Sequence, residues 1–368
     1  MNFPFKIRIF QPIIPEYRVA LFNGLAELYG DRIEIWAAPK VGHDVSQSLT
    51  RMKFDYSHPF RRIGPFSWQC GLSLRGLAKG DVVVVCGDLH QLSSLWMAAC
   101  ARLRGIRVVW WGHHKTATSK PLGVRVRLMV ARILSDVVLC YTRTGISYLE
   151  ERGFARGKVF ATGNTIDQEP IKRAIEGFDV KDRFEGRPGL LCCSVLREKV
   201  HLDLLLKAMS DERLKDVVLA VIGDGPKRRA YEDAAWKYGV ADRVRWIGVT
   251  RDQMVMAPWF LSAKAFVYPG AVGLSILHAM SYGLPVIVHG NAEHQMPEFE
   301  IMEDDKTGLC FDENDERSLA DTIVRLLADE HKRMEMSRYS QKVAFEQYSM
   351  DQMIANFASA IEGAAKED

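Results

Sequence analysis

The sequence predicts an α/β protein with two domains, each built on a parallel β-sheet. Strand-like and helix-like patterns alternate along the chain, which is typical of parallel sheets. Residues 81–86 and 107–111 are continuous apolar runs, as expected for strands that are buried on both faces. The 368 residues suit two domains of ordinary size.

The first domain is expected to span residues 1–168. Its elements follow from apolar runs for strands and from amphipathic spacing for helices. The expected strands are residues 6–11, 32–37, 81–86, 107–111, 137–141 and 158–162. The expected helices are residues 17–29, 92–104, 124–134 and 146–152. The last of these should stop at Gly153, because glycine readily terminates a helix.

A polar stretch, residues 168–188, has no strong strand pattern and is expected to connect the domains. The second domain should span residues 169–349. Its expected strands are residues 189–193, 217–222, 244–247, 265–268 and 285–288. Its expected helices are residues 228–238, 274–282, 316–329 and 330–347, and a final helix should follow from about 350 to 365.

The composition narrows the class of protein. Hydrophobic residues make up 48% of the chain and charged residues 26%, with no apolar run of about eighteen residues, which argues against a transmembrane helix. The N-terminus lacks a signal-peptide profile, and the seven cysteines show neither metal-ligand spacing nor a disulfide framework. A net charge of +3 is too small to indicate nucleic-acid binding. These properties predict a cytoplasmic location.

The most informative segment is residues 268–290, YPGAVGLSILHAMSYGLPVIVHG. A small-residue loop, 269–273, leads directly into an apolar helix, so free backbone N–H groups and the helix dipole should favour a phosphate there. Gly273, Leu274 and Ser275 are therefore predicted to bind phosphate through the backbone. The alternative is an ordinary helix start with Ser275 as N-cap.

Residues 279–287, AMSYGLPVI, resemble the donor-site signature of family 4-type retaining glycosyltransferases with the GT-B fold. The segments 221–226, 240–248, 297–298 and 305–311 resemble the same family in the same order, so the likeness covers roughly residues 189–347. It implies two Rossmann-like domains with parallel sheets facing across an interdomain cleft. The second domain would hold a nucleotide diphosphate sugar and the first an acceptor, with residues 350–368 packing back on the first domain.

Two glutamates that the family usually carries fall on Gly270 and His278. His278 lies where the family contacts the ribose, which a neutral imidazole can still do. The alternative is a core histidine bonded to a backbone carbonyl. Gly270 offers no side chain to the transferred sugar, which suggests a donor with fewer hydroxyls, such as a deoxysugar. Comparing donors between the wild type and Gly270→Glu would test this idea.

The resemblance assigns further donor-site residues. Lys199 matches the lysine that neutralises the donor diphosphate, while the companion arginine position falls on Ser194, so Arg197 is a candidate substitute. The alternative for both cations is a solvated loop. Gly223 and Ile247 complete the expected site, with the backbone of residues 246–250 near the nucleobase. There is no Asp-x-Asp motif in a suitable loop, so no metal cofactor is expected.

The first domain resembles a branch of the family that builds polysaccharides or glycolipids, through Tyr17-Arg18-x3-Phe22-x2-Leu25, Trp111-Gly112-His113 and Tyr141-Thr142. His113 and His114 follow a buried strand at its carboxyl end, where open α/β sheets bind ligands. We expect His113 to orient the sugar or the leaving phosphate. Tyr17, Arg18 and His114 are candidates for acceptor binding. The alternatives are a surface histidine pair and a helix-start role for Glu16. Two roles stay open for Glu298: contact with the donor, or a position at the start of a helix.

Two basic and apolar segments suggest contact with an anionic bilayer. The first contains Lys115, Lys120, Arg125, Arg127 and Arg132 interleaved with Leu122, Val124, Val126, Leu128, Met129 and Val130. The second contains Arg61, Arg62, Phe66 and Trp68. The alternative is a solvated helix face. Lipid-linked acceptors are common in the family, so docking at the inner face of the plasma membrane is the expectation.

The sequence thus predicts a hexosyl- or deoxyhexosyltransferase that moves a sugar, with retention, to a saccharide or lipid-linked acceptor in cell-surface polysaccharide or glycolipid synthesis. Three alternatives stay open. Loss of both glutamates would suit a catalytically silent scaffold or partner subunit. A sugar-nucleotide epimerase or a phosphorylase with the same fold would fit the donor segment less well.

Overall fold

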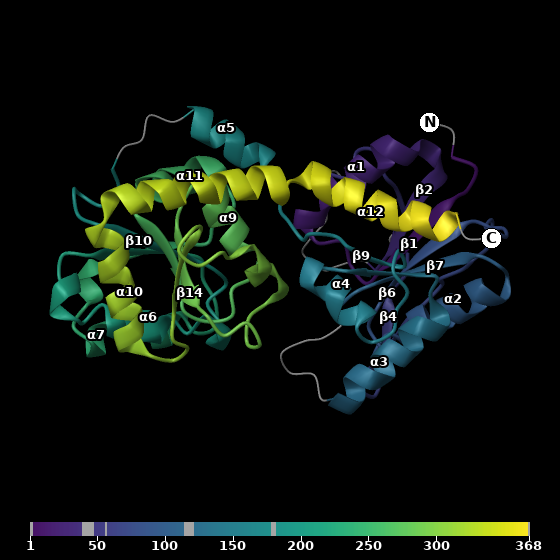
Figure 1. Cartoon of the computed structure of the whole chain (residues 1–368), viewed down its shortest axis with the longest axis horizontal. Helices are drawn as coiled ribbons and strands as arrows, with labels where there is room; N and C mark the ends of the chain where they lie inside the picture. The colour runs from purple at the N-terminus through teal and green to yellow at the C-terminus, as the bar shows by residue number, and fades with distance from the viewer. Residues whose placement is uncertain (1–2, 39–47, 56, 114–120, 178–181, 367–368) are drawn as a thin grey trace. The chain divides into compact units, whose positions relative to one another are not determined.

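The computed structural model describes residues 3–38, 48–55, 57–113, 121–177 and 182–366. Its contacts divide the chain into two compact units. Unit 1 comprises residues 1–167 and 350–368, and unit 2 comprises residues 168–349. Each unit is an α/β body built on a sheet whose paired strands all run parallel. The parallel α/β architecture predicted from the alternating pattern is thereby confirmed (Figure 1).

Within its described residues, unit 1 contains a seven-stranded sheet with the order β3-β2-β1-β6-β7-β8-β9. The strands are β1 (Ile7–Gln11), β2 (Ile33–Ala37), β3 (Lys53–Asp55), β6 (Val82–Cys86), β7 (Arg107–Trp111), β8 (Val137–Cys140) and β9 (Val159–Ala161). The helices are α1 (Val19–Tyr29), α2 (Leu92–Leu103), α3 (Pro121–Leu134), α4 (Arg143–Glu150) and α12 (Met350–Ala365). Strand order reverses direction between β1 and β6, which is where open sheets of this kind bind ligands.

The last helix, α12, belongs to unit 1 although the whole of unit 2 precedes it in sequence. It lies beside α1, as Figure 1 shows, and the side chain of Ile354 packs over Gly24, where a Cβ would lie 2.2 Å from its methyl carbon. Phe357 meets Trp111 edge-on at 4.9 Å between ring centroids. Phe357 is fully buried, so α12 contributes directly to the core of unit 1.

Unit 2 contains a six-stranded sheet with the order β12-β11-β10-β13-β14-β15. The strands are β10 (Gly189–Cys193), β11 (Val218–Ile222), β12 (Val244–Gly248), β13 (Ala265–Tyr268), β14 (Val286–His289) and β15 (Gly308–Phe311). The helices are α5 (Glu169–Gly177), α6 (Leu202–Ala208), α7 (Arg228–Lys237), α8 (Gln253–Ser262), α9 (Ser275–Ser281), α10 (Glu316–Ala328) and α11 (Glu330–Gln347). Here the strand order reverses between β10 and β13.

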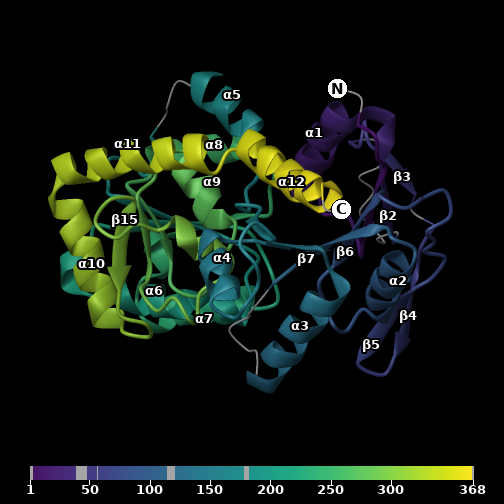
Figure 2. The same cartoon turned by 45° about the vertical axis from the view of Figure 1, so that its right-hand side comes forward.

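Several elements depart from the sequence prediction. The stretch expected to connect the domains contains α5, whose buried Ile171 and Ala174 lie three positions apart on one face. An antiparallel hairpin, β4 (Phe60–Ile63) and β5 (Phe66–Gln69), was not predicted because both strands are short and only Gln69 among their residues is buried (Figure 2). The helix expected over residues 17–29 begins as a short 3-10 turn, Glu16–Arg18, before α1.

Candidate functional site

Three loops converge at the carboxyl edge of the sheet in unit 2. The loop after β13 runs against the turn after β10, because a Cβ built on Gly270 would lie 2.0 Å from the backbone oxygen of Lys199. The loop after β11 meets the same turn, since a Cβ on Gly223 would lie 1.9 Å from the oxygen of Ser194. Gly223 also has a φ of 128°, a region open to glycine. These contacts gather the residues that the sequence singled out at the switch between β10 and β13.

The contact at Gly270 gives a structural reason for a glycine at the position where the family usually has a glutamate. No side chain fits at this position without displacing backbone, so the glycine allows the two loops to touch. The comparison of Gly270→Glu with the wild type, expected above to report on donor specificity, would instead report on a displaced loop.

The segment from Gly270 to Ser275 is held by hydrogen bonds from the next loop. Gln295 is buried, its Oε1 accepts from the N–H of Val272 at 2.8 Å, and its Nε2 donates to the carbonyl of His289 at 2.9 Å. α9 begins at Ser275 with Leu274 as N-cap, and in this fully described stretch no side chain caps it. The alternative of Ser275 as N-cap is therefore wrong. Sequence reasoning missed Gln295, whose role depends on a contact 23 residues away.

His278 is half-buried on α9 of unit 2. Its Nε2 is 3.2 Å from Oε1 of Gln253, an oxygen that also accepts from the Tyr282 hydroxyl at 2.7 Å. The ring packs against Phe260 at 4.7 Å between centroids. Because an amide oxygen only accepts, Nε2 carries the proton, and Nδ1 is left as an acceptor. Burial lowers the pKa of His278 to about 4, so the imidazole is neutral at physiological pH.

These contacts support the interpretation of His278 as a histidine whose hydrogen bond is made within the protein, but they change the identity of its partner. Its partner is the side chain of Gln253, not a backbone carbonyl. Gln253 lies at the start of α8, and nothing in the sequence pattern connected it to His278. A ribose contact through Nδ1 stays a prediction.

The cations of the β10 loop differ in their surroundings. Lys199 lies in the short turn Glu198–Val200 and is exposed, and it forms no salt bridge within the described chain. Its neighbour Glu198 pairs with Lys227 instead. Arg197 is also exposed, and its carbonyl accepts from the Tyr231 hydroxyl at 2.8 Å. Both side chains are therefore placed at the sheet edge where a charged ligand can reach them.

The remaining positions predicted for the donor site are Ser194, Ile247 and Glu298. Ser194, which stands where the family has an arginine, shares a hydrogen bond of 3.2 Å with the Tyr268 hydroxyl. Ile247 is half-buried in β12. The carboxylate of Glu298 faces the loop, since a Cβ on Gly273 would lie 4.0 Å from its Oε2.

Unit 1 carries a second constellation at the carboxyl ends of β1, β7 and β8. Arg18 is only 6% exposed, and its guanidinium carbon lies 4.2 Å from the ring centroid of Trp111 and 5.3 Å from that of Tyr141. The ring of His113 lies 4.5 Å from that of Tyr141. Tyr17 is exposed beside Arg18, 5.5 Å away. Of the residues predicted for the acceptor, His114 lies outside the described residues.

The electrostatics of this second constellation are set by cations. Burial lowers the pKa of His113, and the charges of Arg127 and Arg18 lower it further, against an opposing effect of Asp88. His113 is thus neutral at physiological pH. Arg127 on α3, expected from the sequence to face a membrane, instead acts on His113 and has buried Nε and Nη1 atoms.

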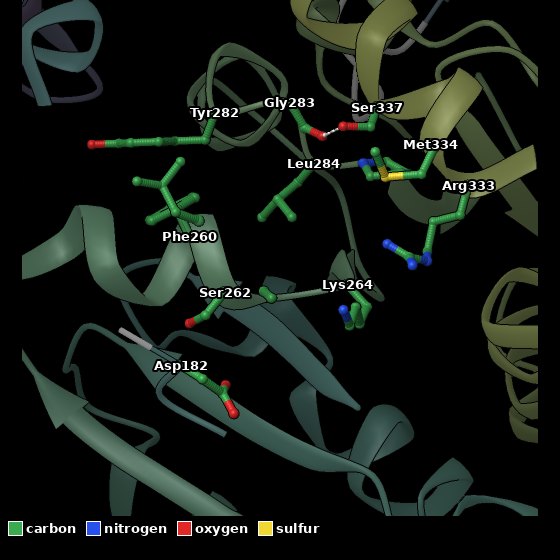
Figure 3. A pocket seen from close by; sticks show the side chains of 13 residues that line it. Asp182, Phe260, Ser262, Lys264, Tyr282, Gly283, Leu284, Arg333, Met334 and Ser337 are labelled. Atoms are coloured by element: carbon green, nitrogen blue, oxygen red, sulfur yellow. Dashed lines mark hydrogen bonds between the residues drawn. The ribbon is translucent and has the colours of Figure 1, made fainter. Parts of the chain in front are cut away.

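A cavity of about 350 Å³ lies elsewhere in unit 2 (Figure 3). Its walls include Lys264 and Leu284, which precede β13 and β14, so it opens at the amino edge of the sheet. Ligands of parallel α/β sheets bind at the opposite edge, and we therefore do not assign the cavity to the functional site. Among the described residues, no group of three or more His, Cys, Asp or Glu side chains is arranged to hold a metal ion.

The known proteins that resemble this chain in sequence are glycosyltransferases. The sequence model of the glycosyl transferases group 1 family matches residues 175–343. The chain is 27% identical over 157 residues to the lipopolysaccharide core biosynthesis glycosyltransferase LpsE of Rhizobium meliloti, covering 42% of this chain and 44% of LpsE. It is 26% identical over 192 residues to a GDP-mannose-dependent α-(1-6)-phosphatidylinositol monomannoside mannosyltransferase of Mycolicibacterium smegmatis, covering 48% of each. The chain thus spans under half the length of these two relatives.

The fold is also found among solved structures. HepE from Anabaena, solved in complex with UDP and glucose, superimposes with a TM-score of 0.69 over 97% of this chain and 99% of HepE. The two sequences are 14% identical, so this likeness concerns the fold. This likeness shows that the chain has the GT-B fold, and within that fold residues 175–343 match the glycosyl transferases group 1 family.

Proposed function

We propose that this protein is a retaining glycosyltransferase. It moves a sugar from a nucleotide diphosphate sugar to a saccharide or lipid-linked acceptor used in cell-surface polysaccharide or glycolipid synthesis. The observation that carries the proposal is the close backbone approach of Gly270 to Lys199. It joins the loop of residues 269–273 (the glycine loop) and the turn Glu198–Val200 (the lysine turn) at one sheet edge. The named activities of LpsE and of the mannosyltransferase support it.

The proposed chemistry at the donor follows from charge. When the bond between the sugar and the diphosphate breaks, negative charge develops on the leaving phosphate. An ammonium group at that position stabilises the charge, and backbone N–H groups of residues 273–275 add to the effect. We assign the ammonium to Lys199, with Arg197 as its neighbour. This arrangement requires no metal ion.

In the proposed transfer, the acceptor hydroxyl attacks the anomeric carbon from the face that the phosphate leaves. The new glycosidic bond forms as the bond to phosphate breaks, and the departing phosphate oxygen takes the acceptor proton. His113 is neutral and orients the sugar or the phosphate without serving as the base. Glu298, close to Gly273, takes the sugar contact that a glutamate at position 270 would make.

A panel of nucleotides tests the proposal. UDP is the first candidate, since HepE was solved with UDP, and GDP, dTDP and CMP complete the set. A nucleotide present at about one hundred times its dissociation constant stabilises the folded protein by about 2.7 kcal/mol and raises Tm by a few degrees. We expect one diphosphate to do so, and its sugar conjugates to release free nucleotide. If no nucleotide shifts Tm in a folded sample, the silent scaffold becomes the better explanation.

We also propose that α3 docks on an anionic bilayer. Leu122, Val126, Met129 and Ile133 are 72%, 40%, 57% and 59% exposed. Their spacing of four, three and four residues places them in one stripe, opposite the buried Val124 and Ala131. We call these four residues the α3 stripe. Arg125 and Arg132 flank it, as suits a helix lying at the surface of an anionic membrane. No described helix is long and apolar enough to cross a bilayer.

Removing two members of the α3 stripe should weaken membrane binding. Each CH₂ group buried in lipid contributes about 0.8 kcal/mol, so Leu122→Ser/Met129→Ser should lower partitioning onto anionic vesicles at least about tenfold. Co-sedimentation at low salt measures this. The control is Leu103→Ser/Trp236→Ser, which removes side chains 89% and 77% exposed on other helices. Equal losses in both variants, or no binding by the wild type, would refute docking through α3.

A further inference from the structure

The constellation in unit 1 contains two cations with buried donors that have no partner. In the described chain, Nη1 of Arg18 is buried without a hydrogen bond, and so are Nε and Nη1 of Arg127. Arg18 also forms no salt bridge with any described residue. A buried guanidinium donor without an acceptor loses its hydration and gains nothing in return, which is costly for a folded protein.

Stacking on aromatic rings does not satisfy these donors. The Arg18 guanidinium lies over Trp111 and near Tyr141, which favours its positive charge through the ring faces. The N–H bonds, however, lie in the guanidinium plane and need an acceptor there. Tyr141 remains a neutral phenol, because burial raises its pKa in spite of the nearby Arg18 charge.

The charges of Arg18 and Arg127 both act on the ring of His113. Both lower the pKa of His113, so both positive charges lie within electrostatic reach of its ring. The acidic group that acts there, Asp88, is already engaged, because its Oδ1 accepts from the backbone N–H and Nδ1 of His90 at 3.0 Å each. Two like charges are therefore brought together beside His113, and the single carboxylate of Asp88 is the one anionic group among the described residues that opposes their effect on its pKa.

The orientation of α3 places Arg127 on the side of the helix that faces the interior of unit 1. The α3 stripe faces outward, and Arg127 lies on the other side of the helix, toward the buried Val124 and Ala131. Tyr17, whose ring lies 5.5 Å from the Arg18 guanidinium, is exposed, so solvent reaches the residue next to Arg18.

From these observations we infer that Arg18 and Arg127 form a binding site for an anionic group on the acceptor, either a phosphate ester or a sugar carboxylate. The inference rests on the proposed function, because it names the chemical class of that enzyme's acceptor. Arg18 supplies the N–H donors of its unpartnered Nη1, and guanidinium N–H groups bind phosphate and carboxylate oxygens well. Arg127 closes the site from α3, and Trp111 and Tyr141 form an aromatic wall behind it.

Three probes that share one sugar test the site: glucose 1-phosphate, glucuronate and glucose. The readout is the imidazole NMR signal of His113 in the full chain, assigned by its loss in His113→Asn. We expect one or both anionic probes to shift this signal, and glucose to leave it unchanged. A response to glucose 1-phosphate alone indicates a phosphate ester, and a response to glucuronate alone indicates an acidic sugar.

Variants locate the response. Because a hydrogen bond to a charged group is replaced by one to a neutral amide, Arg127→Gln should weaken binding of the active probe about tenfold. Arg104→Gln is the control, since Arg104 is an exposed arginine at the end of α2 in the same unit. Arg18→Gln should weaken binding at least as much, and Arg127→Gln decides the matter if that variant fails to fold. Equal affinity in Arg127→Gln and Arg104→Gln, or no shift with either anion, overturns the inference.

The nucleotide panel keeps the two proposals apart, because it reports on unit 2. Nucleotide binding without anion binding refutes the acceptor site alone. Anion binding without any nucleotide response refutes the glycosyltransferase proposal and leaves an anion site in unit 1.

Discussion

Replacing Lys199 by alanine should lower kcat/KM for the nucleotide-sugar donor by about 10²–10³-fold, the usual cost of removing one preorganised group that stabilises developing negative charge. The ammonium group is exposed at the sheet edge and is not engaged in a salt bridge within the described chain, so it is available for the diphosphate. Steady-state release of free nucleotide measures the effect. Since the side chain is exposed, Tm in the absence of ligand should hardly change.

Lys207→Ala is the matched control for Lys199→Ala. Lys207 is an exposed lysine on α6, eight positions further on, and it pairs with Glu316 at 2.7 Å. It should retain the wild-type rate. If Lys199→Ala also retains it, the diphosphate charge is carried elsewhere and the role of Lys199 must be abandoned. Partial recovery in Lys199→Arg would indicate that positive charge, more than exact shape, is required.

The second large effect is expected at Gly270, in stability. A Cβ at this position would lie 2.0 Å from the Lys199 oxygen, and this oxygen belongs to the backbone and cannot rotate away. Either the glycine loop or the lysine turn must move. We expect Gly270→Ala to lower the free energy of unfolding by about 1–3 kcal/mol, as overpacking does. Denaturant unfolding, followed by circular dichroism, measures the loss.

Gly273→Ala controls for the loss of a glycine in the same loop. A Cβ there has Glu298 Oε2 as its nearest neighbour at 4.0 Å, an ordinary contact distance. Neither glycine has a positive φ, so backbone strain does not distinguish the two variants. Gly273→Ala should be close to the wild type in stability. Similar stability of both alanine variants would contradict the tight contact between the loops.

The buried strands were the most predictable part of the fold. Residues 107–111 and 189–193 are continuous apolar runs, and the structure shows β7 and β10 with those bounds. A strand buried on both faces needs apolar residues throughout, so its sequence signal is strong. The hairpin of β4 and β5 has no such need, because only one of its eight strand residues is buried, and it was not predicted.

The candidate site was predictable where it depends on neighbours in sequence. The glycine loop and Lys199 follow apolar strands of unit 2, and His113 follows an apolar strand of unit 1. Within each sheet the parallel strands end at a common edge. The contacts that hold the site could not be predicted in this way. Gln253 meets His278, and Gln295 meets Val272, through pairings that only the tertiary structure creates.

Arg127 shows a second reason why part of the site could not be predicted from the sequence. Apolar residues occupy positions 124, 126, 128, 129 and 130 of α3, so the sequence does not reveal which side of the helix is buried. The structure buries Val124 and Ala131, and this choice turns Arg127 inward. A cation assigned to a membrane surface therefore became a candidate ligand-binding group.

The position of α12 has a consequence for biosynthesis. Residues 350–365 emerge from the ribosome only after all of unit 2, yet Phe357 fills part of the core of unit 1 against Trp111. Unit 2 is one continuous segment and can complete its core during translation, as domains commonly do. Unit 1, although begun first, must wait with part of its apolar surface uncovered. In the nascent chain the order of folding is therefore the reverse of the order of synthesis.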